Sequence, residues 1–225
     1  MRFTKAILVS AASLLLPLMG QATPVNTVGT LSVGGLSFDN FACSVTKQGV
    51  AGPTSCGKID VSTISNPAQG IQFSSGFLAG SLGFLSFDDA TINYHVTSAA
   101  GIDKIGLDFN GTFYGWAISS VTETVKDSNN NIVGFATVQC GPGAIGCTRS
   151  DSIALNGVYN DLYVVKDINV SSFVGLAQIS YVDQTFSLAP EPGSLAMLGA
   201  GLLGVAGLLR RRSKLAAAKA ANNNV

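Results

Sequence analysis

The sequence predicts an all-β protein, an antiparallel β-sandwich that follows an N-terminal signal peptide and precedes a single C-terminal transmembrane helix. Between residues 23 and 189, glycine, serine, threonine and valine recur, and short runs alternate apolar with polar residues. No stretch of this region keeps a 3.6-residue apolar period over three helical turns. Apolar segments with basic residues beside them lie at both ends of the chain.

The first 22 residues have the three parts of a secretory signal peptide. Residues 1–5 contain two basic side chains, residues 6–19 are apolar, and residues 20–22 form a small-x-small cleavage site. We therefore expect export of the chain, with cleavage between Ala22 and Thr23. A buried helix is the alternative interpretation of so short an apolar run.

Residues 23–189 are expected to form one exported domain, since 167 residues can bury a substantial core. Six basic and twelve acidic residues give this region a net charge of −6. An acidic surface disfavours binding to nucleic acid or to anionic lipid. Calcium ions would suit such a surface, and residues 127–131 resemble the first half of a calcium-binding loop. The motif fails, however, because Ile132 occupies the position that needs glycine.

The four cysteines suit an oxidising compartment. Cys43 and Cys56 enclose twelve residues, and Cys140 and Cys147 enclose a turn-rich segment of six. Four cysteines allow three pairings, and proximity in the sequence favours Cys43 with Cys56 and Cys140 with Cys147. A zinc site is the alternative, but neither spacing is Cys-x2-Cys, so no metal is expected.

The expected strands are separated by turns rich in glycine, proline and asparagine. They cover residues 27–33, 36–38, 58–64, 71–77, 91–97, 104–109, 112–126, 132–139, 161–170 and 176–186. Asn110-Gly111 is expected to close a hairpin between 104–109 and 112–126, and the polar turn after residue 126 a second hairpin. Nine to eleven strands at these spacings predict a sandwich. A β-helix is the alternative, but the sequence has no repeat of fixed period.

No group of residues predicts catalysis or a cofactor. His95, the single histidine, is expected on the opposite strand face from its neighbours, and no Gly-x-Ser-x-Gly motif accompanies it. Asp88 and Asp89 would point apart if they lay on a strand, and a solvated turn is the favoured interpretation. We expect a protein that is not an enzyme, and a secreted hydrolase that uses Asp88, Asp89 or Asp108 is the weaker alternative.

Tyr114 and Trp116 are the candidate residues for binding a sugar. Because they lie two positions apart on an expected strand, they would share a face and could stack on a polysaccharide. Burial in the core next to Ile118 is the favoured interpretation, since large aromatic side chains mostly drive burial. A carbohydrate-binding module of a polysaccharide layer is therefore the alternative function.

The C-terminal region has three consecutive parts. They are Pro190-Glu191-Pro192, the apolar segment 194–209, and Arg210-Arg211-Arg212. The prolines end any preceding strand and leave the glutamate between them extended and accessible. As a helix the apolar segment would measure roughly 24 Å, slightly less than the ~30 Å hydrocarbon core. The arginines favour the cytoplasmic side, so residues 213–225 would form a cytoplasmic tail. A plain membrane anchor is the alternative.

In order and spacing these parts resemble the sorting tail of PEP-CTERM proteins, over residues 190–212. The resemblance implies processing by an exosortase, a membrane-embedded protease or transpeptidase. The exosortase would recognise Pro190, Glu191 and Pro192, while Arg210, Arg211 and Arg212 would stop translocation of the chain. It also implies a Gram-negative bacterium in which the chain is held transiently in the inner membrane and then reaches the surface. We expect a matrix protein associated with exopolysaccharide or biofilm. The extension 213–225 departs from the usual end of the family's tails.

Overall fold

The computed structural model describes residues 22–66, 68–189, 193 and 197–206 of the chain. Within these residues, ten strands form one sheet in which every pairing is antiparallel. The strands are β1 Thr23–Pro24, β2 Leu31–Val33, β3 Leu36–Gln48, β4 Val50–Gly52, β5 Asp60–Ile64, β6 Gln69–Phe109, β7 Thr112–Lys126, β8 Ile132–Gly141, β9 Gly146–Thr148 and β10 Ser150–Leu188. The predicted all-β, antiparallel class is confirmed. The predicted signal peptide lies almost wholly outside the described residues.

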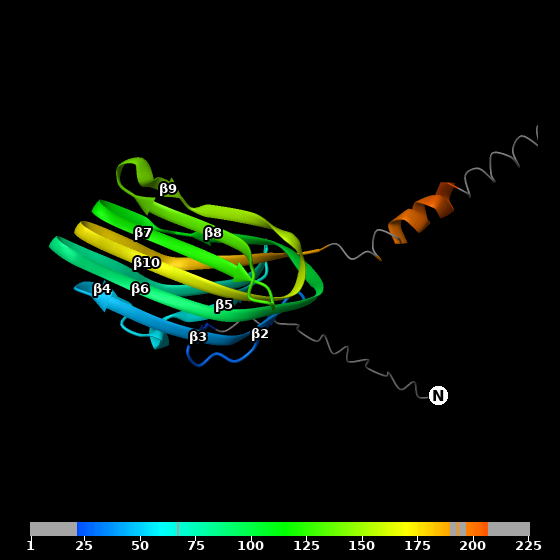
Figure 1. Ribbon diagram of the computed structural model, residues 1–225, viewed down its shortest axis with the longest axis horizontal. Coiled ribbons are helices and arrows are strands. Elements are labelled where there is room, and N and C mark those ends of the chain that lie inside the picture. The colour runs from blue at the N-terminus through cyan, green and yellow to red at the C-terminus, as the bar shows by residue number, and fades with distance from the viewer. Residues whose placement is uncertain (1–21, 67, 190–192, 194–196, 207–225) are drawn as a thin grey trace, which may run out of the picture.

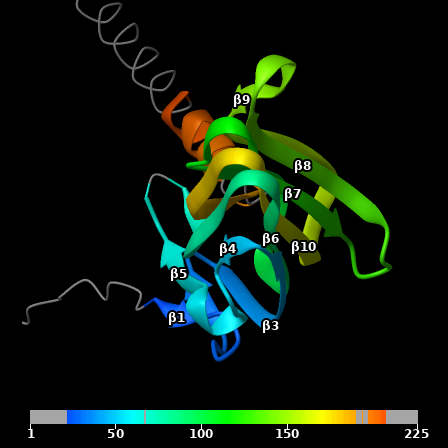
Figure 2. The same cartoon turned by 90° about the vertical axis from the view of Figure 1, so that its left-hand side faces the viewer.

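Two long strands, β6 and β10, organise the sheet. Its order is β1-β5-β6-β10-β7-β8-β9, while β3 and β4 also pair with β6, and β2 pairs with β3. The end of β10 pairs with both ends of β6, because Val182 lies opposite Phe73 and also opposite Phe109. The sheet therefore folds over itself into two layers that share their longest strands (Figure 1, Figure 2).

An apolar core fills the space between the layers. Phe73 and Tyr94 both belong to β6, yet their ring centroids lie 5.8 Å apart across the core. Phe38 of β3 and Phe186 near the end of β10 meet in the same way at 5.6 Å. Burial of each such ring contributes about 1.5–3 kcal/mol, which is why the layers stay closed.

At one end of the sheet, three strands pass together from one layer to the other. There β6, β7 and β10 each have a glycine with positive φ, at Gly83 (127°), Gly115 (70°) and Gly175 (125°). Gly115 lies directly opposite Gly175, and a Cβ atom on Gly175 would come within 2.0 Å of the Tyr114 carbonyl oxygen. Only glycine combines this conformation with so close a backbone approach.

Both predicted disulfides are present. Cys43 of β3 is bonded to Cys56, which begins the 3-10 turn η1 Cys56–Lys58. Cys140 of β8 is bonded to Cys147, its partner in the register of β8 with β9. The two bonds hold the ends of short outer elements to longer strands.

One predicted hairpin is confirmed and the other is wrong. β7 and β8 pair as expected, and the Asp127 carboxylate accepts backbone N–H bonds from Asn129 and Asn131 in the turn. The segments on either side of Asn110-Gly111 do not pair, because β10 lies between β6 and β7. Instead the Asn110 side-chain oxygen accepts N–H bonds from residues 180 and 181 of β10, at 2.8 and 2.9 Å.

Several expected strands are parts of longer ones. The segments 71–77, 91–97 and 104–109 all belong to β6, and 161–170 and 176–186 belong to β10. The start of β10, from Ser150, was not predicted. Residues 197–206 are helical, but no helix within the described residues has both the length and the hydropathy for a membrane span.

Candidate functional site

Large apolar side chains are exposed around the three bends. Val174 of β10 lies opposite Leu82 of β6 and also opposite Trp116 of β7, so the register brings the three strands together here. Leu82 is 93% exposed and Trp116 is 73% exposed. We call this surface the bend patch, and it consists of Leu82, Phe84, Leu85, Phe113, Tyr114, Trp116, Phe173, Val174 and Leu176. Contiguous exposed apolar side chains of this kind typically mark an interaction site.

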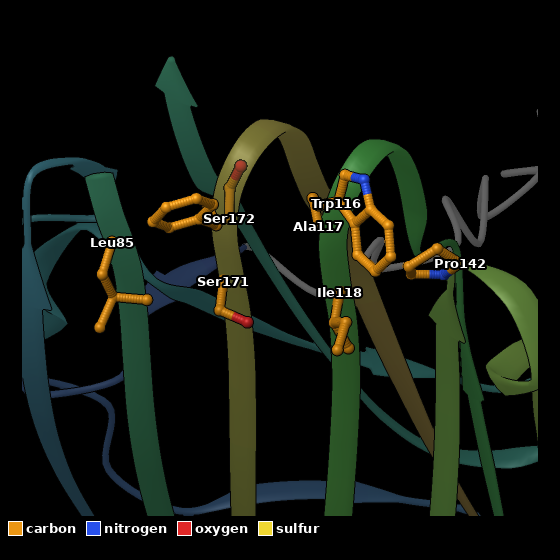
Figure 3. A pocket seen from close by; sticks show the side chains of 8 residues that line it. Leu85, Trp116, Ala117, Ile118, Pro142, Ser171 and Ser172 are labelled. Carbon is orange, nitrogen blue, oxygen red and sulfur yellow. The ribbon is translucent and has the colours of Figure 1, made fainter. Parts of the chain in front are cut away.

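A pocket of about 230 Å³ adjoins the bend patch and shares Leu85, Trp116 and Phe173 with it. Figure 3 shows the Trp116 indole beside Pro142, with Ile118 further along the same strand. Ser171 and Ser172 of β10 also line the pocket. The Ser172 hydroxyl oxygen is buried and has no hydrogen-bond partner among the described residues. The pocket thus combines apolar walls with the partly exposed side chain of Ser171.

The structure places both predicted sugar-binding residues on the surface. Tyr114 is 77% exposed, and the first five residues of β7 are all exposed, so the interpretation that favoured burial in the core is wrong. The physical reason is the bend at Gly115, which carries this part of β7 past the core. Burial begins one residue after Trp116, at Ala117.

His95 has a surrounding that its position in the sequence did not indicate. Its side chain is 13% exposed, and its Nδ1 and Nε2 atoms each lie 2.9 Å from a carboxylate oxygen, of Asp39 and Asp161 respectively. The Tyr163 ring stacks on the imidazole at 4.7 Å. Burial alone would lower the pKa of His95, but the two hydrogen-bonded carboxylates more than offset this and raise the pKa above 6.5.

This arrangement makes the stability of the protein depend on pH. A histidine whose pKa is raised by folding stabilises the fold fully below its unfolded pKa of 6.5, and this contribution disappears as the pH rises through the folded value. We expect His95→Gln to lower the Tm by about 2–4 °C near pH 6, the effect of about 1 kcal/mol in a domain of this size. The difference should shrink as the pH rises through the folded pKa of His95. Calorimetry of both proteins at pH 6 and at increasing pH measures the difference, and a difference that grows with pH would contradict the prediction.

The structure does not bring the candidate hydrolase carboxylates together. Asp88 is fully buried, and burial followed by the charge of Asp89 raises its pKa to about 7, so the predicted solvated turn is wrong. The prediction that Asp88 and Asp89 point apart is confirmed, because Asp89 lies on the outer face of β6. On that face, burial and then the neighbouring Asp89 raise the pKa of Asp167. Asp108 pairs with the start and the end of β10, far along β6.

Lys166 is part of a buried polar cluster that sequence reasoning missed. Its Nζ atom donates hydrogen bonds to Glu123 at 2.5 Å and to the Gln184 side-chain oxygen at 2.7 Å. All three side chains are fully buried. Burial lowers the pKa of Lys166 although Glu123 acts in the opposite direction. The signal was present in the alternation, since Lys166 is the one charged residue in the inward-facing series Leu162, Val164, Lys166, Ile168, Val170.

Three solved structures illustrate how distant the structural likenesses are. The enzymatically active domain of tailspike protein 4 of bacteriophage CBA120 shares 15% identity at a TM-score of 0.32, over 66% of this chain and 19% of that chain. TmCBM61 in complex with β-1,4-galactotriose shares 12% identity with this chain at a TM-score of 0.32, over 64% of this chain and 88% of that chain. The structure of accessory secretory protein 1, 2 and 3 from Streptococcus pneumoniae shares 11% identity at a TM-score of 0.31, over 76% of this chain and 98% of that chain. The chain therefore spans less than a fifth of the tailspike domain's length. The comparison with curated proteins gives no match.

The C-terminal region gives a specific match. The family model described as the PEP-CTERM protein-sorting motif matches residues 188–212. It includes all six predicted recognition and stop residues, which lie outside the described residues: Pro190, Glu191, Pro192, Arg210, Arg211 and Arg212. The match begins at Leu188, the last residue of β10. The chain thus carries a PEP-CTERM protein-sorting motif directly after its β domain, which confirms the resemblance drawn from its sequence.

Proposed function

We propose that the chain is an exported protein of the cell surface or extracellular matrix, processed by an exosortase and without catalytic activity. Its signal peptide exports it, its C-terminal segment holds it in the inner membrane, and processing near Pro190-Glu191-Pro192 releases or transfers it. The domain then becomes part of a layer of exopolysaccharide or biofilm. The observation that carries this proposal is the sorting motif at 188–212.

The domain connects to this motif without a spacer. Leu188 still pairs with Ile102, and the Ala189 backbone N–H donates to the Gly101 carbonyl oxygen at 2.9 Å. Both disulfides suit an exported protein, because thiols stay reduced in the cytosol. The absence of catalysis is supported by His95, whose two nitrogens both face carboxylates and so cannot accept a proton from a nucleophile.

Processing is tested by the mass of the C-terminal peptide of the mature protein. In the native host we expect the mature chain to lack residues 195–212. Replacing Pro190, Glu191 and Pro192 together by alanine should leave the unprocessed chain in the membrane fraction, because the extended recognition segment is lost. Ser213→Ala, just beyond the motif, is the matched control and should be processed normally. A mature wild-type chain that retains residues 195–212 would reject processing.

A second candidate function is carbohydrate binding at the bend patch. Exposed aromatic rings can stack on the apolar faces of sugar rings, and the hydroxyl group of Ser171 could bond to a sugar hydroxyl. The patch also lies at the opposite end of the domain from Ala189, since the bends and the Gly101–Ala189 contact are at opposite ends of the strands (Figure 1). An anchored chain would therefore present the patch outward.

Trp116→Ala is expected to weaken retention on the host polysaccharide about tenfold, which corresponds to about 1.4 kcal/mol. The Tm should change little, because the side chain is largely exposed. Phe135→Ala removes an exposed aromatic ring of β8 outside the patch and is the matched control. Affinity electrophoresis of the three proteins measures retention, and equal retention by all three would count against binding at the patch.

A further inference from the structure

The buried cluster of Lys166, Glu123 and Gln184 contains the groups needed to form an amide. The Lys166 nitrogen lies 2.7 Å from the carboxamide oxygen of Gln184. The carboxamide carbon is bonded to that oxygen at about 1.23 Å, so it lies within roughly 3.9 Å of the nitrogen. Reacting atoms in near-attack geometries are about 3–3.5 Å apart. The amine and the carboxamide are therefore almost in position to react.

The surroundings favour a nucleophilic amine. No side chain of the cluster is exposed to water, and burial lowers the pKa of Lys166 toward the neutral, nucleophilic form. The Gln184 side-chain nitrogen donates to the Gly106 carbonyl oxygen at 3.1 Å, which orients the carboxamide oxygen toward Lys166. Glu123 contacts the amine through Oε2, while its Oε1 is buried without a hydrogen-bond partner among the described residues.

We propose that Lys166 and Gln184 form an intramolecular isopeptide bond, with Glu123 carrying the protons. A bond forms between Nζ of Lys166 and Cδ of Gln184, and the bond between Cδ and Nε2 breaks. Of the three ammonium protons, one stays on the new amide, one passes through Glu123 to Nε2, and one remains on the Glu123 carboxyl group. Nε2 leaves as ammonia, and no oxidant, cofactor or further reactant is needed. The reaction replaces a buried ion pair by neutral groups, which favours it in a dry interior.

Gln184 is a better electrophile than Glu123 in this cluster. Amide formation at Glu123 would consume the one carboxylate that can take protons from the amine, because a carboxamide does not act as a base. Lys166 and Glu123 also lie directly opposite each other on paired strands, whereas Gln184 belongs to the other layer. Only the bond to Gln184 joins the two layers covalently.

The position of this bond suits a domain that is attached through its C-terminus, an argument that rests on the proposed function. Gln184 precedes Leu188, where the sorting motif begins, by four residues. Tension applied through the tail would reach Gln184 and pass covalently to Lys166 in the middle of β10. The last part of β10 would then not peel away from β6. Bond formation itself does not require processing, so its test is independent of the exosortase.

The test is the intact mass of the full chain, reduced and denatured. We expect the measured mass to fall below the mass calculated from the sequence between the chain's actual first and last residues. The difference should equal the mass of one ammonia molecule. Fragment spectra should show a branched peptide that joins the segments around Lys166 and Gln184. Lys166→Arg and Glu123→Gln should each restore the full calculated mass, because arginine stays protonated and a glutamine carboxamide cannot take up a proton from the amine. Lys104→Arg, at an exposed lysine of β6, is the matched control and should keep the deficit.

Three results would overturn the proposal. The first is a wild-type mass equal to the calculated mass, which decides the question even if the variants fail to fold. The second is a deficit that persists in Lys166→Arg, because it would then arise elsewhere in the chain. The third is a deficit of one water molecule, which would assign the bond to Glu123 instead of Gln184.

Discussion

Glu123→Ala is expected to destabilise the folded domain by about 3–5 kcal/mol, because it blocks the bond to Gln184 and leaves the Lys166 ammonium group of the variant buried without its counter-charge. The carboxylate oxygen 2.5 Å from Nζ is removed, and the remaining acceptor, the Gln184 side-chain oxygen, is neutral. In a domain of this size the corresponding fall in Tm is about 10 °C. Urea unfolding followed by circular dichroism measures the free energy directly.

The size of this loss comes from the unpaired charge, and a double variant separates that charge from simple loss of contact. Glu123→Leu combined with Lys166→Met replaces both partners by apolar side chains and should recover most of the stability that the unpaired charge costs in Glu123→Ala. Asp103→Ala removes a carboxylate from β6 outside the cluster and should change stability by less than about 0.5 kcal/mol. A loss below about 1 kcal/mol in Glu123→Ala would mean that Lys166 is not held as a buried cation in the variant.

The features that were predicted correctly depend on residues close together in the sequence. Both disulfides close short loops, the β7–β8 hairpin has a polar turn of a few residues, and the sorting motif is contiguous. Alternation of apolar and polar residues likewise indicates which side of a strand is buried, so the all-β class could be predicted. These patterns are all local.

The errors concern which strands pair. Asn110-Gly111 has the composition of a hairpin turn, but β10 occupies the space beside β6 and receives the Asn110 side chain instead. Alternation is the same whichever strand lies alongside, so it could not indicate this insertion. Likewise, a glycine with positive φ, such as Gly83, lets a strand bend and continue where the sequence indicated that it ended.

The two polar clusters were missed for the same reason. Asp39, His95 and Asp161 belong to three different strands, and only the register of β3 and β10 on β6 brings them together. Lys166 and Glu123 could have been noticed as charged residues at inward positions of their strands. Their partnership depends on β7 pairing with β10, which the sequence does not indicate.

Because the bends create the bend patch, a substitution there tests the fold and the candidate site together. Gly175→Ala is expected to lower stability by about 3 kcal/mol. Positive φ at a non-glycine residue costs about 1–3 kcal/mol, and displacement of packed neighbours adds about 1–3 kcal/mol. The neighbour in question is backbone, since a Cβ atom at this position would lie 2.0 Å from the Tyr114 carbonyl oxygen. β7 must therefore move away from β10 where Trp116 lies.

Gly143→Ala isolates the backbone strain from this displacement. Gly143 also has a positive φ, of 62°, but a Cβ atom there would meet nothing within 4 Å. We expect a loss of only about 1–2 kcal/mol from the strain alone. Trp116 is the only tryptophan of the chain, so its fluorescence reports on the bend, and its emission should change in Gly175→Ala but not in Gly143→Ala. Equal losses with unchanged emission in both variants would show that the close approach of Gly115 and Gly175 does not hold the bend patch together.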